Sequence, residues 1–340
     1  MAKMKIVFFE TEKWECDILQ HLCGEAEIVF CEKRLDARSA AAYLDADVIS
    51  TFVHSTLDRE TLDPFSRLKF IATRSTGFDH IDLEYCRTKA IPVSNVPTYG
   101  GTTVAEHVFA LLLAISHHIP EAVNRTRRGD FSQAGLRGFD LQNKTLGVIG
   151  TGHIGKRVAE IARGFRMEVM AYDPAPDEAF ARQAGLSYVD WQTLLTQSDC
   201  ITLHVPGGVG TRHMISGEAF SRMKKGVILI NTARGSVVDV KALLRALAEG
   251  SVAAAGLDVL PEEPSIREEA ELLRSFFSQE HDLETLLADH LLLRMRNVII
   301  TPHSAFNTTE AVEKILRTTA GNIQGFLHGK LQNVVIQDLM

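Results

Sequence analysis

Short apolar runs rich in Val, Ile, Leu and Phe alternate with helix-like segments along the whole chain. Continuous apolar strands are typical of parallel sheets buried on both faces, and the helices between them supply the crossovers that parallel strands require. The pattern therefore predicts an α/β protein. The predicted strands are Lys5–Phe9, Glu27–Phe30, Val48–Phe52, Phe70–Thr73, Thr145–Ile149, Glu168–Tyr172, Cys200–His204, Val227–Asn231, Ala253–Leu257 and Val298–Thr301.

Length and charge limit the class of protein. With 340 residues, the chain has room for about two domains of roughly 150 residues. It has 43 acidic and 36 basic residues, so it lacks the basic excess that binding to nucleic acid requires. We find no apolar run of about 18 residues and no signal peptide pattern, which predicts a cytoplasmic protein without a membrane span.

The cysteines and histidines show no metal-binding pattern. The five cysteines form no C-x-x-C pair, so we expect free thiols in a reducing compartment. Neither Glu106-His107 nor His117-His118 has the H-E-x-x-H spacing of a zinc-binding helix. We therefore predict no metal site.

The first predicted sheet ends near residue 100, at a turn-rich stretch from Asn95 to Gly101. A long apolar helix is expected to open at 102–106, because Thr103 and Glu106 have the spacing of a capping box. The charged stretch Arg125–Lys144 is interpreted as a surface loop that leads into a second sheet.

The predicted strand Thr145–Ile149 runs into the glycine pattern G-x-G-x-x-G, formed by Gly150, Gly152 and Gly155 around His153 and Ile154. This pattern allows a tight turn, close approach of a pyrophosphate, and packing of the following helix, whose N-terminus attracts the phosphates.

An acidic residue follows the glycine pattern at the expected distance. Asp173 lies 18 residues past Gly155, where a carboxylate can bind the adenosine ribose. A carboxylate there repels a 2′-phosphate, and residues 174–176 contain no arginine that could bind one. The sequence therefore predicts NAD rather than NADP.

Three ionisable side chains follow separate predicted strands, at the end where open α/β sheets bind ligands. They are Arg234, Glu263 and His303. An arginine can hold a substrate carboxylate through two hydrogen bonds, and a histidine oriented by a carboxylate can donate a proton to a ketone oxygen. Taken singly, Arg234 or Glu263 would be assigned to a surface ion pair, but together the three suit hydride transfer to a 2-oxo acid.

An ordered series of motifs resembles the D-isomer-specific 2-hydroxyacid dehydrogenase family over essentially the whole chain. The matching stretches are Gly147–Gly155, His204-Val205-Pro206, Asn231–Gly235 with Val238-Asp239, Gly256–Val259 with Glu263-Pro264, and Thr301-Pro302-His303. The resemblance implies that Arg234 binds the substrate, that His303 is the acid/base, and that Glu263 is its partner.

The same resemblance implies a domain arrangement. A Rossmann-type, parallel-sheet NAD-binding domain (102–307) is expected to be inserted into a discontinuous, flavodoxin-like α/β substrate domain (1–101 and 308–340). The C-terminal helix would then return to pack on the first sheet. A homodimer is expected through the NAD-binding domain, using the helix that begins near Thr102.

Further site residues are implied by the resemblance alone. The turn Ser75-Thr76-Gly77 would offer backbone N–H groups to the substrate carboxylate. Residues lining the cofactor would be Val205, Pro206, Thr211, Thr232, Ala233 and Asp258.

The D-lactate dehydrogenase branch is the nearest match within the family. Tyr99 and Phe306 would shape a small apolar substrate pocket, or alternatively belong to an interdomain core. Two features depart from other branches: the H-x-G-G turn is absent, and the stretch Ser265–Asn297 is long, with helices predicted at Glu268–Phe277 and Leu283–Leu293.

The function predicted on these grounds is NADH-dependent reduction of a small 2-oxo acid to the D-2-hydroxy acid, with pyruvate and D-lactate favoured. One alternative is a glyoxylate/hydroxypyruvate reductase of the same family. Another is a non-catalytic, NAD-sensing binding protein like the co-repressor relatives of the family.

Overall fold

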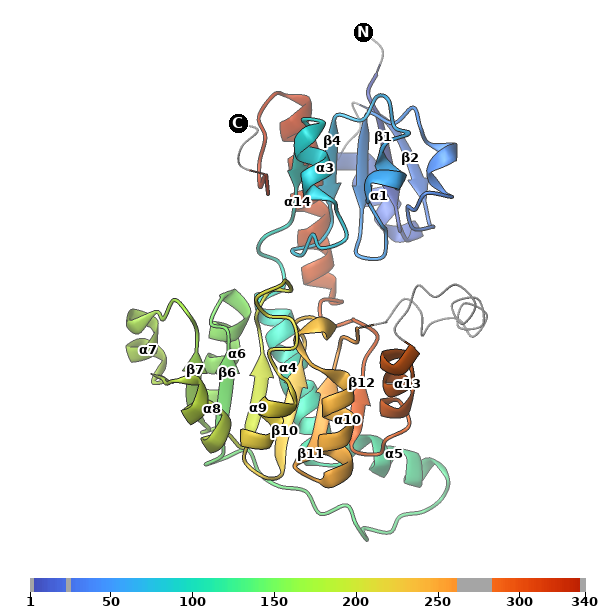
Figure 1. The fold of residues 1–340 in the computed structure, drawn as a ribbon. Helices are drawn as coiled ribbons and strands as arrows, with labels where there is room; N and C mark the ends of the chain where they lie inside the picture. The colour runs from blue at the N-terminus through green and yellow to red at the C-terminus, as the bar shows by residue number, and fades with distance from the viewer. Residues whose placement is uncertain (1–2, 23–25, 262–282, 337–340) are drawn as a thin grey trace. The chain divides into compact units, whose positions relative to one another are not determined.

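The computed structural model describes residues 3–22, 26–261 and 283–336, which divide into two units with one sheet each (Figure 1). Unit 1 is formed by Met1–Tyr99 together with Thr308–Met340, and unit 2 by Gly100–Asn307. All strand pairs within both sheets are parallel, and helices alternate with the strands along the chain. The predicted α/β class is therefore confirmed.

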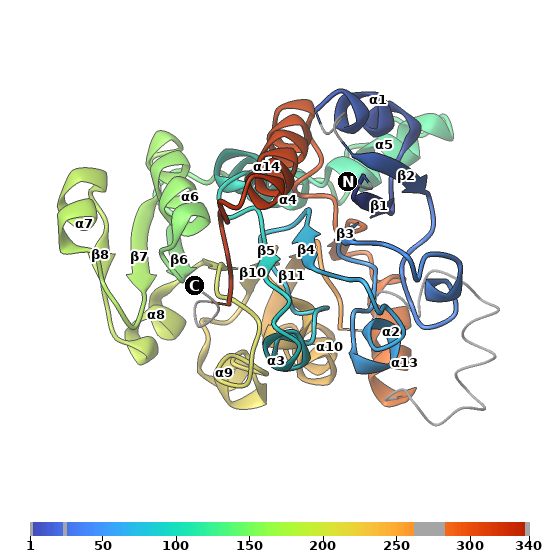
Figure 2. The same cartoon turned by 90° about the horizontal axis from the view of Figure 1, so that it is seen from above.

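Unit 1 contains the strands β1 (Lys5–Phe9), β2 (Glu27–Cys31), β3 (Val48–Thr51), β4 (Phe70–Thr73) and β5 (Val93–Ser94), and the helices α1 (Lys13–Leu22), α2 (Arg59–Leu62), α3 (Leu83–Thr88) and α14 (Thr309–Leu327). The sheet order β2-β1-β3-β4-β5 is that of flavodoxin-like folds. Helices α1 and α14 pack together on one face, and α2 and α3 lie on the other (Figure 2). Stacked rings of Phe70 and Phe326, with centroids 4.6 Å apart, join α14 to the sheet.

Unit 2 contains the strands β6 (Thr145–Ile149), β7 (Glu168–Tyr172), β8 (Ser187–Tyr188), β9 (Cys200–Leu203), β10 (Val227–Asn231), β11 (Val252–Leu257) and β12 (Val298–Ile300). Their order is β12-β11-β10-β9-β6-β7-β8. Counted from β6, this is the Rossmann order with one strand added at the β12 edge. The expected Rossmann-type sheet is therefore present.

Helices cover both faces of the unit 2 sheet. The described helices of unit 2 are α4 (Gly101–Ser116), α5 (Ile119–Arg127), α6 (His153–Gly164), α7 (Glu178–Ala184), α8 (Trp191–Gln197), α9 (Gly217–Arg222), α10 (Val240–Glu249) and α13 (Leu283–Leu292), of which α5 adds no residue to the core. One hydrophobic core lies between the sheet and helices α4 and α6, and Ile228 and Ile230 of β10 point into it. The other lies between the sheet and helices α8, α9, α10 and α13, and Val227 and Leu229 of β10 point into it. Because alternate side chains of β10 enter opposite cores, the strand is apolar throughout, as its sequence indicated.

Two strands were not predicted, and three predicted strands end one residue earlier than expected. Strands β5 and β8 have two residues each, too few to produce a recognisable apolar run. Three residues predicted to end strands are instead the first residues of the loops that follow: Phe52, His204 and Thr301. The loops after β9 and β12 carry candidate site residues, among them Val205 and His303.

The predicted capping box at Thr103 is wrong. Helix α4 begins at Gly101 and its N-cap is Gly100, so Thr103 lies inside the first turn. The helix begins earlier than its apolar pattern indicated, and a capping side chain is not part of its start.

The stretch Arg125–Lys144 is a loop only from residue 128 onward. Its first three residues belong to α5, which has Pro120 in its first turn and an ion pair of 2.7 Å between Glu121 and Arg125. A proline near the start and an i,i+4 ion pair both favour helix, which explains why the turn-rich composition misplaced this boundary.

The remaining predictions on local structure have mixed outcomes. The predicted helix Leu283–Leu293 is present as α13, one residue shorter, whereas Glu268–Phe277 lies outside the described residues. Cys16, Cys31, Cys86 and Cys200 are free thiols, and Cys23 lies outside the described residues. Within the described ranges, no single helix is long and apolar enough to cross a membrane; α4 and α5 reach that length and composition only as a pair, bent by 61°.

Candidate active site

The candidate residues of unit 2 lie at the carboxyl edge of its sheet. The glycine pattern follows β6, Asp173 follows β7, and His204 opens the loop after β9. The other candidates follow the three strands on the opposite side of β9: Thr232, Ala233 and Arg234 after β10, Asp258 after β11, and His303 after β12. Strand order reverses between β6 and β9, and open α/β sheets bind their ligands at such a switch point.

The glycines of the pattern have different structural roles. Gly150 has φ +90°, and a Cβ there would lie 2.6 Å from the carbonyl oxygen of His204. A Cβ on Gly155 would lie 2.0 Å from the carbonyl oxygen of Gly150, so this glycine allows α6 to pack on its own loop. A Cβ on Gly152 would meet no atom within 4 Å. The packing of the described residues therefore does not require Gly152, and space remains beside it.

The surroundings of Gly152 fit the pyrophosphate of a dinucleotide. Gly152 is the N-cap of α6, and no side chain caps this helix end within the described part of the chain. Helix N-termini attract phosphate through their N–H groups and their positive dipole end. At the same edge, the hydroxyl of Thr232 is buried without a hydrogen-bond partner among the described residues. His153, exposed, and Ile154, half-buried, are the first residues of α6.

Asp173 is anchored to the glycine loop. Its Oδ2 accepts hydrogen bonds from the backbone N–H of Thr151 (2.7 Å) and from the Thr151 hydroxyl (3.0 Å), and its Oδ1 accepts from the N–H of Ala175 (2.9 Å). Burial raises the pKa of Asp173, but the bonds from Thr151 and Ala175 outweigh it and hold the pKa below its usual value. The side chain is therefore a fixed carboxylate at neutral pH.

The loop that carries Arg234 is held by a buried amide. Asn231, the last residue of β10, is 1% exposed. Its Oδ1 accepts from the N–H of Ala233 (3.0 Å), and its Nδ2 donates to the carbonyl of Arg234 (3.0 Å). Ala233 is buried and Arg234 half-buried, and the guanidinium donates to the carbonyl of Ala233 at 2.8 Å. This turn fixes the backbone from which Arg234 projects.

His303 lies in a loop that is organised by Asp258. The Asp258 carboxylate, 1% exposed, accepts hydrogen bonds from the Thr301 hydroxyl and from the N–H groups of Ser304 and Ala305, the latter two at 2.9 Å. The N–H of His303 donates to the carbonyl of Asp258 at 2.9 Å. His303 itself has φ +52°, a left-handed backbone that is costly for a residue with a side chain. The buried carboxylate therefore maintains an unfavourable turn that carries the candidate acid.

Helix α4 contributes one residue to this arrangement. His107 Nε2 lies 3.0 Å from the Thr301 hydroxyl and 3.5 Å from Asp258 Oδ1. Burial raises the pKa of Asp258, but the bonds from His107, Thr301, Ala305 and Ser304 outweigh it, and the pKa lies below its usual value. Asp258 is therefore an anchored anion.

The loop after β9 is closed on itself. The Thr211 hydroxyl donates to the carbonyl of Pro206 at 2.7 Å, and the side chain of Val205 lies beside Gly150 of the glycine loop. Burial lowers the pKa of His204 to about 3, and its Nε2 lies 2.9 Å from the Thr202 hydroxyl. His204 is thus neutral at pH 7 and unsuited to hold a proton for transfer.

In unit 1, the turn Ser75-Thr76-Gly77 follows β4. The Thr76 hydroxyl donates to the carbonyl of Val96 (2.7 Å), and Asn95 Nδ2 donates to the carbonyl of Thr76 (2.8 Å). Among the described residues, we find no acceptor for the backbone N–H groups of Thr76 and Gly77. The bonds to Val96 and Asn95 hold this turn in place. Its two available N–H groups are the kind of donor that binds an anion.

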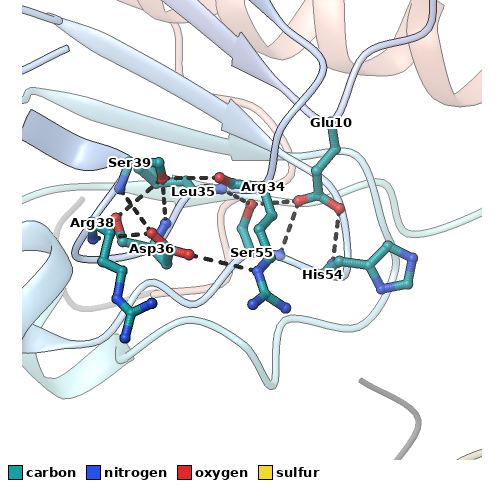
Figure 3. A network of polar contacts seen from close by, with 8 residues as sticks. All are labelled: Glu10, Arg34, Leu35, Asp36, Arg38, Ser39, His54 and Ser55. Carbon is teal, nitrogen blue, oxygen red and sulfur yellow. Dashed lines mark hydrogen bonds and ion pairs between the residues drawn. The ribbon is translucent and has the colours of Figure 1, made fainter. Parts of the chain in front are cut away.

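Arg74 precedes this turn and is 2% exposed. Its Nη2 donates to the carbonyls of Phe9 and Glu10, both at 2.7 Å. The carboxylate of Glu10 is itself bound by the N–H groups of His54 (2.9 Å) and Ser55 (3.0 Å), as Figure 3 shows. Burial lowers the pKa of Arg74, and the charges of Glu15 and Glu10 counteract it. The loops at the carboxyl edge of β1, β3 and β4 are thereby tied together.

Three candidate residues stay without a structural account. Glu263 lies outside the described residues. Tyr99 and Phe306 are half-buried and belong to different units, Tyr99 to unit 1 and Phe306 to unit 2, so their pocket stays a prediction.

The sequence interpretation missed several residues that support the site. Asn231 and Arg74 could have been found as polar residues directly at the ends of apolar strands. Thr151 and His107 have no such signal, because their partners Asp173 and Asp258 are distant in sequence.

Comparison with known proteins gives matches along the chain. Residues 109–305 match the family model of the NAD binding domain of D-isomer specific 2-hydroxyacid dehydrogenases. The chain is 33% identical over 333 residues to D-lactate dehydrogenase of Escherichia coli, covering 96% of this chain and 98% of that protein. It is 37% identical over 304 residues to a glyoxylate reductase of Thermococcus litoralis, covering 87% and 85%.

A solved structure is also similar. The crystal structure of D-lactate dehydrogenase from Aquifex aeolicus, complexed with NAD and lactic acid, matches with a TM-score of 0.87 and 36% identity. The match covers 97% of this chain and 98% of that one, so it includes both units.

The close packing at Gly155 leads to a prediction on stability. We expect Gly155→Ala to lower the free energy of unfolding by about 3 kcal/mol, because the added Cβ would clash with the Gly150 carbonyl. Gly164→Ala, in the same helix with open space around it, is the control and should be neutral or stabilising by about 0.5–1 kcal/mol. Urea unfolding measures both, and equal stability of the two variants would contradict the packing described.

The anchored carboxylate of Asp258 leads to a prediction on pH. Folding lowers the pKa of Asp258. The carboxylate therefore stabilises the fold fully above about pH 4, the pKa of an aspartate in the unfolded chain, and this stabilisation is lost as the pH falls through the pKa of the folded state. Asp258→Asn should therefore cost about 2–3 kcal/mol at pH 7 and less at about pH 3. The exposed Asp140→Asn is the control. A cost that grows as the pH is lowered would refute the anchoring role.

Proposed function

The chain belongs to the D-isomer-specific 2-hydroxyacid dehydrogenase family and uses NAD, and we propose that it reduces pyruvate to D-lactate. The observation that carries this proposal is the position of the glycine loop, Arg234 and His303 at one edge of a parallel sheet. The D-lactate dehydrogenases among the relatives support pyruvate as the substrate.

The proposed roles follow from the chemistry of each side chain. Arg234 binds the carboxylate and the carbonyl oxygen of the 2-oxo acid, because a guanidinium presents paired donors to such groups. When bound, NADH supplies the hydride for the carbonyl carbon. His303 holds the proton that the carbonyl oxygen receives, and Glu263 is proposed to orient its imidazole ring. The strained backbone at His303 is typical of positions at functional sites.

The proposed cofactor site uses the residues around the glycine loop. Gly150, Gly152 and the first turn of α6 would hold the pyrophosphate, and Asp173 the adenosine ribose. Space at Gly152 and the unpartnered Thr232 hydroxyl support this assignment, as judged from the described part of the chain. The remaining lining residues would be His153, Ile154, Val205, Pro206, Thr211, Ala233 and Asp258.

The substrate site is proposed to include residues of unit 1. The backbone N–H groups of Ser75-Thr76-Gly77 would bind the substrate carboxylate, and Tyr99 and Phe306 would contact its C3 substituent. The available N–H groups of Thr76 and Gly77 support the first assignment.

A second candidate substrate is glyoxylate. The glyoxylate reductase of Thermococcus litoralis is 37% identical to this chain, a higher identity than that of the Escherichia coli D-lactate dehydrogenase. The catalytic roles proposed for Arg234 and His303 apply equally to this reaction.

We further propose a cytoplasmic homodimer that forms through unit 2, using α4, the helix expected to begin near Thr102. Helix α5 has no buried residue, and it and the following loop expose the apolar side chains of Ile119, Val123 and Phe131 (49%, 39% and 80%). Exposed apolar side chains in unit 2 support an interface there. A solution mass equal to one chain would overturn the proposal.

NADH oxidation with a panel of 2-oxo acids tests the function. We expect the highest kcat/KM with pyruvate and a D-configured product, compared with 2-oxobutyrate, glyoxylate, hydroxypyruvate and phenylpyruvate. Preference for glyoxylate would favour the second candidate. NADH binding without oxidation of NADH by any acid would instead indicate the non-catalytic, NAD-sensing class.

Arg234→Lys tests the proposed substrate contact. A lysine keeps the charge but cannot form two parallel hydrogen bonds, so kcat/KM for pyruvate should fall about 100-fold, through both KM and kcat. Arg212→Lys is the control, an exposed arginine in the loop after β9. An unchanged kcat/KM in Arg234→Lys would exclude the role.

A further inference from the structure

A second acidic residue stands near Asp173, and its carboxylate engages a lysine of the phosphate-binding helix. Asp177 Oδ2 lies 2.5 Å from Nζ of Lys156, which directly follows Gly155 in α6. The other oxygen of Asp177 accepts from the N–H of Phe180 at 3.0 Å, because Asp177 is the N-cap of α7. The carboxylate is therefore fixed by the backbone as well as by the lysine.

The ammonium of Lys156 has two partners, the carboxylate of Asp177 and the ring of Phe180. Besides the ion pair with Asp177, its ammonium lies 5.1 Å from the ring centroid of Phe180, a cation–π distance. The hydrogen bond that Lys156 donates to Asp177 is the largest cause that raises the pKa of Lys156, and the charges of Tyr188 and Asp173 contribute. Lys156 thus lies within electrostatic reach of Asp173, the residue proposed to bind the adenosine ribose, but its ammonium is already paired with Asp177.

We propose that Asp177 determines cofactor choice by withholding Lys156 from a 2′-phosphate. This inference rests on the ribose role proposed for Asp173 and adds a second element to it. Asp173 repels a 2′-phosphate directly, whereas Asp177 removes the nearby cation that could attract one. The three charges sum to one negative charge, which opposes the nearly doubly charged 2′-phosphate of NADP.

The repulsion by Asp173 and the pairing of Lys156 with Asp177 are expected to affect binding of a 2′-phosphate interdependently. Replacing Asp173 alone removes repulsion but leaves Lys156 bound to Asp177, so affinity for a 2′-phosphate should rise little. Replacing both aspartates removes repulsion and releases the ammonium. Asparagine is a suitable replacement at position 177, because it caps helices as well as aspartate and carries no charge.

Calorimetric binding of 5′-AMP and 2′,5′-ADP to the full-length protein tests the proposal. Asp173→Ser/Asp177→Asn should bind 2′,5′-ADP about tenfold more tightly than Asp173→Ser, the scale of one charge-assisted hydrogen bond. Adding Lys156→Met should abolish the gain. Asp173→Ser/Asp190→Asn is the matched control, since Asp190 caps α8 in the same manner and its replacement should change neither affinity.

Two results would overturn the proposal. One is an affinity for 2′,5′-ADP that is the same in Asp173→Ser and in Asp173→Ser/Asp177→Asn, and the other is a gain that survives Lys156→Met. Neither fragment contains a nicotinamide, so these measurements do not depend on whether pyruvate is the substrate. Failure of the proposed reaction would be seen separately, in the assay with 2-oxo acids.

Discussion

The parallel direction of the seven strands described in unit 2 is the constraint on which the proposed site depends. Parallel strands place all their carboxyl ends at one edge, so residues from positions 150, 173, 234, 258 and 303 are brought to that edge by pairing alone. The order reversal between β6 and β9 opens space there, and Gly150 and Gly155 permit the tight loop that faces it. The sheet thus assembles groups that no local sequence could bring together.

Buried polar side chains fix the conformations of the loops at that edge. Asn231 holds the turn of Arg234, Asp258 holds the turn of His303, and Asp173 holds the glycine loop. Each satisfies backbone N–H or C=O groups that would otherwise be buried without partners, which is costly. Arg74 and Glu10 do the same at the carboxyl edge of unit 1. Preorganised loops of this kind are what orientation of a substrate requires.

Much of the fold could be predicted from the sequence because strands buried on both faces are continuously apolar. The runs at β6, β7 and β10 were placed to the residue for this reason. Strands β5 and β8 could not be found, since two residues carry no pattern. At the site, the glycine pattern and the strand ends located the candidates, whereas Thr151, His107 and Lys156 act through partners that only the folded chain brings near.

The edge residues are proposed to perform a proton-coupled reduction rather than only to bind a dinucleotide. The most direct test is His303→Ala, with turnover of pyruvate and the Kd of NADH measured on the same preparation. We expect turnover lower by about 1,000-fold and an unchanged Kd, because a general acid acts on the substrate and not on cofactor binding. Near-native turnover, or a loss explained entirely by weaker NADH binding, would contradict it.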